Sequence, residues 1–241
     1  MKNILILFLL GNFIFADSIK VAVATNVSYA IKPLIKEFNK TNKTEVKVIL
    51  GSSGKLTAQI RNKAPYDIFL SANMKYPNAL YTDKIAVKKP VIYAQGALAI
   101  FSSRKRDLKD IFIINHAKKI AIANPKTAPY GEAAYEAISN AKLFSSNIKK
   151  FVYAENIAQT VQYSISATDI GFIAASSLYS SKMKKYKLNE NYILVDSSLY
   201  TPINQGIALL NNKKQSEKFY DFLLSKEAKK ILRTYGYNNF E

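Results

Sequence analysis

The 241-residue chain has no cysteine, no tryptophan and one histidine, and its acidic residues are few. Without cysteine it cannot form disulfides, thiolate-ligated zinc sites, iron–sulfur clusters or a thiol nucleophile. The single histidine, His116, argues against multi-histidine metal sites and Ser–His catalysis, and its Lys-rich surroundings predict an exposed position. The 17 Asp and Glu residues face 35 Lys and Arg residues, so the formal net charge is 35 − 17 = +18.

A surplus of 18 positive charges first suggests nucleic acid or an anionic membrane surface as a partner. The basic residues, however, form short scattered runs such as Arg104–Arg106 and Lys182–Lys185. Aromatic residues are not interleaved with these runs, as they are on surfaces that bind single-stranded nucleic acid. The runs are typical of a solvated surface, and a secreted polyanion or nucleic-acid binder is an alternative that rests on charge alone.

The first 16 residues have the composition of a targeting segment. Lys2 carries one positive charge, Ile4–Phe15 is an almost unbroken apolar run, and the small Ala16 precedes Asp17. This order predicts a secretory signal peptide, residues 1–16, that is cleaved after Ala16. The run is shorter than the about 20 residues of a membrane-spanning helix, so we expect a soluble, exported protein. Loss of Lys2 leaves a charge of 34 − 17 = +17.

Beyond this segment, short apolar runs alternate with segments of helical periodicity. Predicted strands are Ile19–Ala24, Val46–Leu50, Ile68–Ser71, Gly96–Phe101, Lys119–Ala123, Phe151–Tyr153, Ile170–Ala174 and Ile203–Leu210. Predicted helices are Tyr29–Phe38, Leu56–Lys63, Tyr76–Asp83, Gly131–Ala141, Ala158–Ser166, Ser216–Leu224 and Lys226–Tyr235. This alternation indicates an α/β protein with parallel or mixed sheets. The apolar fraction of 49% supplies a core, and the length favours two lobes with a cleft between them.

Four strand-to-helix joints have similar chemistry: Ala24–Ser28, Gly51–Lys55, Pro125–Gly131 and Ala154–Ala158. Each offers free backbone N–H groups and the positive end of a helix dipole, which together bind anions. In open α/β sheets, ligands bind beyond the carboxyl ends of the strands. Ser, Thr and Asn are also ordinary N-cap residues, so one joint says little. Four of them, two in each lobe, predict an anion site.

Enzymatic interpretations of the same residues fail or find little support. Gly51–Lys55 resembles the end of a P-loop, but Ile49 and Leu56 stand where that motif requires Gly and Ser/Thr. The chain has no G-x-S-x-G elbow. Asp67 and Asp169 precede buried strands, where carboxylates commonly accept hydrogen bonds from loop amides, and a catalytic pair is the weaker interpretation. We therefore expect no enzymatic activity.

Seven motifs occur in order along the chain: A-T-N at Ala24–Asn26, GSSGKLTAQI at Gly51–Ile60, APYDIFLSA at Ala64–Ala72, PKTAPYG at Pro125–Gly131, ENIAQ at Glu155–Gln159, DIGFI at Asp169–Ile173 and Y-G-Y at Tyr235–Tyr237. With these motifs the chain resembles the periplasmic molybdate-binding proteins of ABC transporters, a branch of the type-II periplasmic binding proteins. The resemblance extends over nearly all of the mature chain.

This resemblance implies a two-lobed type-II periplasmic-binding-protein fold, with residues 17–95 and 204–241 in lobe 1, residues 96–203 in lobe 2, and crossover strands between them. It implies that molybdate, and also tungstate, binds in the cleft without a cofactor or a direct protein ligand to the metal. The implied contacts are Thr25, Asn26, Ser52 and Ser53 from lobe 1, and Tyr130 and the backbone N–H of Ile157 from lobe 2. Whether Tyr130 contributes its side chain or its backbone stays open.

The implied partners are a membrane permease and its cytoplasmic ATPase, which a monomeric periplasmic receptor contacts at the membrane surface without binding nucleic acid.

Neutral donors and helix dipoles suffice to hold a fully ionised tetrahedral dianion. A protonated phosphate would instead require an acceptor, so a pocket of donors discriminates between anions. Closure of the lobes would exclude water and complete the donor set. A receptor for another tetrahedral oxyanion, such as sulfate, is the alternative within this class.

Overall fold

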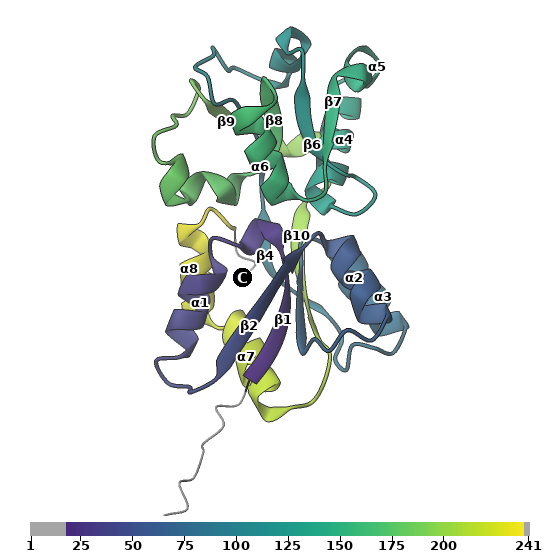
Figure 1. Ribbon diagram of the computed structural model, residues 1–241, viewed down its shortest axis with the longest axis vertical. Coiled ribbons are helices and arrows are strands. Elements are labelled where there is room, and N and C mark those ends of the chain that lie inside the picture. Colours follow the sequence, from purple (N-terminus) through teal and green to yellow (C-terminus); the bar gives the residue numbers. More distant parts are fainter. Residues whose placement is uncertain (1–17, 239–241) are drawn as a thin grey trace, which may run out of the picture.

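The computed structural model describes residues 18–238, so the predicted signal peptide lies outside the described residues. Two five-stranded mixed sheets, each flanked by helices, form two lobes that lie one above the other along the long axis of the molecule (Figure 1). None of the helices that the structure describes is long and apolar enough to cross a membrane.

The sheet of lobe 1 has the strand order β2-β1-β3-β10-β4. Its strands are β1 (Ser18–Ala24), β2 (Glu45–Gly51), β3 (Ile68–Ser71), β4 (Val91–Gly96) and β10 (Ile203–Leu209), and its helices are α1 (Ile31–Phe38), α2 (Ser53–Arg61), α3 (Lys75–Thr82), α7 (Lys214–Leu224) and α8 (Lys226–Thr234). β1 runs parallel to β2 and β3, whereas β10 is antiparallel to both its neighbours. Alternate side chains of β1 face opposite ways: Val21 and Val23 pack with α1, α7 and α8, and Ala22 packs with α2 and α3.

The sheet of lobe 2 has the order β7-β6-β8-β5-β9. Its strands are β5 (Leu98–Phe101), β6 (Ile120–Ala123), β7 (Phe151–Ala154), β8 (Ile170–Ala174) and β9 (Tyr192–Leu194), and its helices are α4 (Pro129–Asn140), α5 (Phe144–Asn147) and α6 (Ile157–Ser166). β6 is parallel to β7 and β8, and β5 is antiparallel to β8. Each lobe thus contains three parallel strands, followed in the sheet by an antiparallel strand that borders the crossover between lobes.

The chain crosses between the lobes beside Ala97, and this corrects one predicted strand. Gly96–Phe101 was expected as a single strand, but it divides between two sheets. Gly96 ends β4, where it pairs with Ile203 of β10, and Leu98 begins β5, where it pairs with Ala174. The sequence of this run does not reveal that the pairing partners change after its first residue.

Three helices begin earlier than their hydrophobic periodicity predicts. α2 begins at Ser53 instead of Leu56, α4 at Pro129 instead of Gly131, and α6 at Ile157 instead of Ala158. The first turns of α2 and α4 contain Ser, Gly and Pro, which interrupt the periodic pattern, although Tyr130 and Ile157 themselves are buried in the core of lobe 2. Their true starts place three predicted site residues in the first turn of a helix: Ser53, Tyr130 and Ile157.

Candidate functional site: a small polar cavity between the lobes

A small cavity lies between the two lobes. Its lining contains all six residues that the sequence singled out: Thr25, Asn26, Ser52, Ser53, Tyr130 and Ile157. Five further residues complete the lining: Ala24, Gly51, Ala72, Ala128 and Pro129. All six predicted residues are at most 7% exposed, so a small ligand held there would be largely removed from water.

The parallel strands bring these residues together. β1 leads into the 3₁₀ helix Thr25–Val27, and β2 leads into α2 at the same edge of the lobe 1 sheet. In lobe 2, β6 and β7 lead into α4 and α6 in the same way. The first N–H groups of each helix have no intrahelical acceptor and carry partial positive charge. Helix starts from both lobes therefore converge on one cavity, which is the arrangement that binds anions.

The two serines leave hydroxyl hydrogens available. Ser52 is the N-cap of α2 but makes no side-chain cap hydrogen bond, and its buried Oγ has no partner among the described residues. Ser53 Oγ accepts the backbone N–H of Ala72 at 3.0 Å. This bond occupies a lone pair and leaves the Ser53 hydrogen free to donate.

Asn26 is fixed by hydrogen bonds on both its side chain and its backbone. Its Nδ2 donates to Gln205 Oε1 at 2.7 Å and to Tyr237 Oη at 3.0 Å. Its main-chain oxygen accepts from Tyr237 Oη at 2.8 Å and from Ser176 Oγ at 3.0 Å. Both amide hydrogens are thereby used, and the buried Oδ1 has no partner among the described residues. The side chain consequently offers an acceptor rather than a donor.

Tyr130 reaches from α4 toward the crossover strands. Its buried Oη makes no hydrogen bond of normal geometry in the described part of the chain, although the Asn26 side chain lies nearby. A Cβ at Gly96 would collide with this hydroxyl, so only glycine fits at the end of β4. Burial raises the pKa of Tyr130 well above 10, the nearby Tyr237 raises it further, and Asn26 acts in the opposite direction. The hydroxyl therefore stays protonated near neutral pH.

Direct contacts join the lobes beside the cavity. Gly54 N, in the first turn of α2, donates to the main-chain oxygen of Thr127 at 2.9 Å. The Lys55 ammonium lies 2.5 Å from the Glu155 carboxylate, and both side chains are about half exposed at 54%. These interlobe contacts hold α2 against the loop before α4 and the residue before the α6 N-cap.

The cavity itself is uncharged. Within residues 18–238, its lining contains no Asp, Glu, Lys, Arg or His. The same part of the chain holds no group of three or more acidic or histidine side chains arranged to bind a metal ion. An anion bound here would meet only neutral donors.

The two aspartates that precede strands, Asp67 and Asp169, accept hydrogen bonds from backbone N–H groups, as the favoured interpretation predicted. Asp67 accepts from the backbone N–H of Lys20 at 2.6 Å, and Asp169 accepts from those of Lys118 and Lys119 at 2.8 and 2.9 Å. Both lie at the amino ends of their strands, β3 and β8, whereas the cavity lies at the carboxyl ends. His116 is exposed, as expected.

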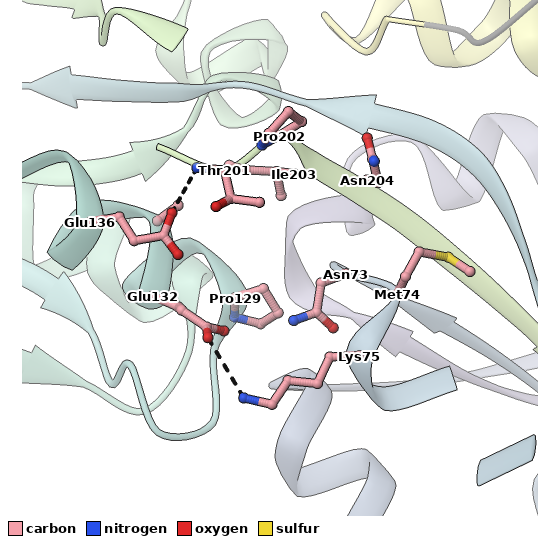
Figure 2. Close-up of a pocket in the computed structure, with 11 residues that line it drawn as sticks. Asn73, Met74, Lys75, Pro129, Glu132, Glu136, Thr201, Pro202, Ile203 and Asn204 are labelled. Atoms are coloured by element: carbon pink, nitrogen blue, oxygen red, sulfur yellow. Dashed lines mark hydrogen bonds and ion pairs between the residues drawn. The ribbon is translucent and has the colours of Figure 1, made fainter. Parts of the chain in front are cut away.

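A second, larger hollow lies beside β10 and has different chemistry (Figure 2). Across it, the Lys75 ammonium of α3 faces the Glu132 carboxylate of α4 at 3.6 Å. Glu136, one turn further along α4, accepts the Thr201 N–H at 2.7 Å. Its charged groups already pair with one another or with backbone, so they secure lobe 2 to lobe 1 and to the segment before β10.

Gln205 and Tyr237 belong to the site but were not singled out as site residues. Gln205 is wholly buried in β10, and the polar pair Asn204-Gln205 within the strand Ile203–Leu209 is the signal that could have found it. Tyr237 lies in the terminal Y-G-Y motif, but nothing in the local sequence indicates that its hydroxyl contacts Asn26.

Two α/β lobes joined by crossover strands, with a small uncharged cavity between helix N-termini, define a two-lobed binding protein. The chain belongs to the bacterial extracellular solute-binding protein family, whose sequence profile matches residues 19–238.

Its relatives include the molybdate-binding protein ModA of Azotobacter vinelandii, which is 30% identical over 230 residues covering 92% of this chain and 90% of the relative. ModA of Rhodobacter capsulatus is also 30% identical, over 92% of this chain and 88% of the relative. The structure of the Azotobacter vinelandii periplasmic molybdate-binding protein superimposes with a TM-score of 0.85 at 27% identity, covering 92% of this chain and all of that one. The sulfate-binding protein SubI of Mycobacterium tuberculosis shares the fold, with a TM-score of 0.76 at 10% identity over 93% of this chain and 88% of that one.

Proposed function

We propose that this protein is the periplasmic receptor of an ABC importer, that it binds molybdate and also tungstate in the cavity between its lobes, and that it delivers the anion to a membrane permease driven by a cytoplasmic ATPase. The observation that carries the proposal is the convergence of helix N-termini from both lobes, together with two serine hydroxyls from lobe 1, on a small uncharged cavity. The names of relatives that are 30% identical over nearly the whole chain support molybdate as the anion.

In this proposal the Ser52 and Ser53 hydroxyls donate to the anion from lobe 1, together with Thr25 and the main-chain N–H groups at Asn26 and at the start of α2. From lobe 2, the Ile157 N–H and the Tyr130 hydroxyl donate. Ile157 is the first residue of α6, so its N–H has no intrahelical acceptor. The Asn26 Oδ1 is an acceptor, so Asn26 contributes its main-chain N–H to the anion and not its side chain.

The remaining parts of the proposal concern the whole molecule. We place lobe 1 at residues 17–95 and 204–241 and lobe 2 at residues 96–203, boundaries that lie one residue inside the lobe 1 strands because Gly96 ends β4 and Ile203 begins β10. Export removes residues 1–16, and the mature protein acts as a monomer without a cofactor, without catalytic activity and without nucleic acid as a partner. The surplus of basic residues lies outside the cavity lining, so it raises the local concentration of anions without selecting among them.

Titration of the purified mature protein tests the proposal. Molybdate, tungstate, sulfate and phosphate are added separately while tyrosine fluorescence and the melting temperature are recorded, since a ligand that binds only the folded state raises the latter. We expect molybdate and tungstate to raise the melting temperature far more than sulfate or phosphate. A response to sulfate alone would mean that the ligand is sulfate and not molybdate. No response to any oxyanion would refute the proposal. Salt-sensitive DNA binding would favour the polyanion alternative.

A further inference from the structure

Gln205 does not line the cavity, but its side chain contacts two residues that do, Asn26 and Ala72. Its Oε1 accepts from Asn26 Nδ2 at 2.7 Å. Its Nε2 donates to the main-chain oxygen of Ile203 at 3.1 Å and approaches that of Ala72 at 3.4 Å. The backbone N–H of Ala72 in turn donates to Ser53 Oγ at 3.0 Å. One side chain thus connects to Asn26 directly and to Ser53 through a single residue.

The two carbonyl groups determine which way the Gln205 amide faces. Because Ile203 and Ala72 both present acceptors, the donor end of the Gln205 amide must face them and its oxygen must face Asn26. Because the Gln205 oxygen can only accept a hydrogen bond, Asn26 must turn its Nδ2 toward it and not its Oδ1. The orientation of Asn26 therefore follows from main-chain carbonyls that cannot turn.

The strand is irregular at this position. The pairing of β10 with β4 shifts register between Gln205 and Gly206, where β4 contains the additional residue Tyr93. The Gln205 side chain is 0% exposed. A fully buried amide is expected to have its hydrogen bonds satisfied, because each unmade bond would cost stability.

We propose that Gln205 is a positioning residue for anion binding: it sets the orientation of Asn26 and, through Ala72, the placement of the Ser53 hydroxyl. The inference rests on the proposed function, since it concerns the same cavity. It adds that affinity depends on a residue of a crossover strand that does not touch the anion.

Two substitutions of Gln205 test it, with Gln95 as the matched control. Gln205→Met keeps the length and removes both hydrogen-bonding ends, so we expect molybdate affinity to fall about ten- to hundredfold. Gln95 lies on the neighbouring strand β4, and its Nε2 donates to Asn204 Oδ1 instead of to the cavity residues. Gln95→Met should change the affinity less than about threefold.

Gln205→Glu supplies a readout that loss of packing would not give. When protonated, the new carboxyl group keeps one acceptor for Asn26 and one donor for the main-chain oxygen of Ile203, and it loses only the second donor, which approaches Ala72. When ionised, it faces two carbonyl oxygens and lies near the anion. Burial raises the pKa of a carboxyl group, so molybdate affinity of this variant should fall by at least about tenfold as the pH rises from about 5.5 to about 8.5, while the wild-type affinity stays level.

A double-mutant cycle with Asn26→Ala completes the test, because coupled residues give non-additive changes. Gln205→Met should cost less affinity in the Asn26→Ala protein than in the wild type. Unchanged affinity of Gln205→Met, a Gln205→Glu pH profile parallel to the wild type, or additive losses would each overturn the inference while leaving the proposed function intact. If the wild-type protein binds no oxyanion, the proposed function fails and the inference fails with it.

Discussion

Replacing Gly54 by alanine should block closure of the lobes without removing any donor side chain from the cavity. A Cβ at this position would lie 2.9 Å from Tyr76 Oη, 3.0 Å from Thr127 Cα and 3.1 Å from the Thr127 main-chain oxygen. Non-bonded carbon atoms prefer separations of about 3.5–4.0 Å. The loop that carries Thr127 would have to retreat from α2 by roughly half an ångström.

The expected loss follows from the contacts that this retreat disrupts. The Gly54 N–H···O hydrogen bond to Thr127, at 2.9 Å, would lengthen, and such a bond contributes about 1 kcal/mol. Helix starts from lobe 2 would also withdraw from an anion held by lobe 1. Together these changes should weaken binding by about 1–2 kcal/mol, or roughly 5- to 30-fold. Alanine is the better helix former, so the lobe itself should lose little stability.

Isothermal titration with molybdate measures the affinity, and thermal unfolding without anion checks the fold. Lys55→Ala is the matched control, because it lies next along α2 and removes only the exposed ion pair with Glu155. Exposed pairs contribute about 0–1 kcal/mol, so the control should bind within about fivefold of the wild type. Wild-type affinity for the Gly54→Ala protein would refute the idea that tight approach of α2 to the Thr127 loop is needed.

Further expectations concern single groups. Ile157→Pro removes the N–H at the first position of α6, where proline is tolerated. Titration should show that this variant binds molybdate about 10- to 100-fold more weakly than an Ile157→Val control of the same helix content. Equal affinities of the two variants would show that this amide does not bind the anion. Burial raises the pKa of Tyr130 and Tyr93 well above 10, so these phenols ionise more readily in the unfolded chain. The free energy of unfolding should therefore be level below about pH 10 and fall above it, as denaturant titrations would measure; a level profile to higher pH would contradict the assigned burial. Burial acts to raise the pKa of Asp67, but hydrogen bonds from Lys20, Lys213 and Asn211 outweigh it and hold the pKa below its usual value. The stabilisation by Asp67 should be present above the usual carboxyl pKa and lost in acid. Asp67→Ala should lower the free energy of unfolding by about 2 kcal/mol and leave the molybdate affinity unchanged. Weaker binding by this variant would show that the carboxylate contributes to the anion site.

The position of the cavity could be predicted because its chemistry is local. Ser52 and Ser53 directly follow β2 as the N-cap and first residue of α2, and a parallel sheet brings such joints to one edge. The network below the cavity could not be predicted in this way. Asn26 meets Gln205 and Tyr237 across 179 and 211 residues, and no local pattern encodes contacts over such separations.

The secondary structure likewise contains elements that could be predicted from the sequence and elements that could not. Long segments with clear periodicity, such as the core of β1 and the apolar face of α1, were predicted within a few residues of their observed bounds. The three-residue strand β9 and the four-residue helix α5 are too short for periodicity to reveal them. The predicted strand Gly96–Phe101 corresponds to β5 and includes only the last residue of β4, and Val91–Gln95 was not predicted as a strand.

The late position of β10 in the chain has a consequence for how the molecule assembles. β10 lies between β3 and β4, so those two strands cannot be incorporated into one sheet until residues 203–209 are available. Lobe 2 contains its five strands within residues 98–194 and does not have to wait. Contacts between distant residues slow folding, so lobe 2 should fold first during refolding. The anion cavity should form last, when Tyr237 reaches Asn26 near the opposite end of the chain.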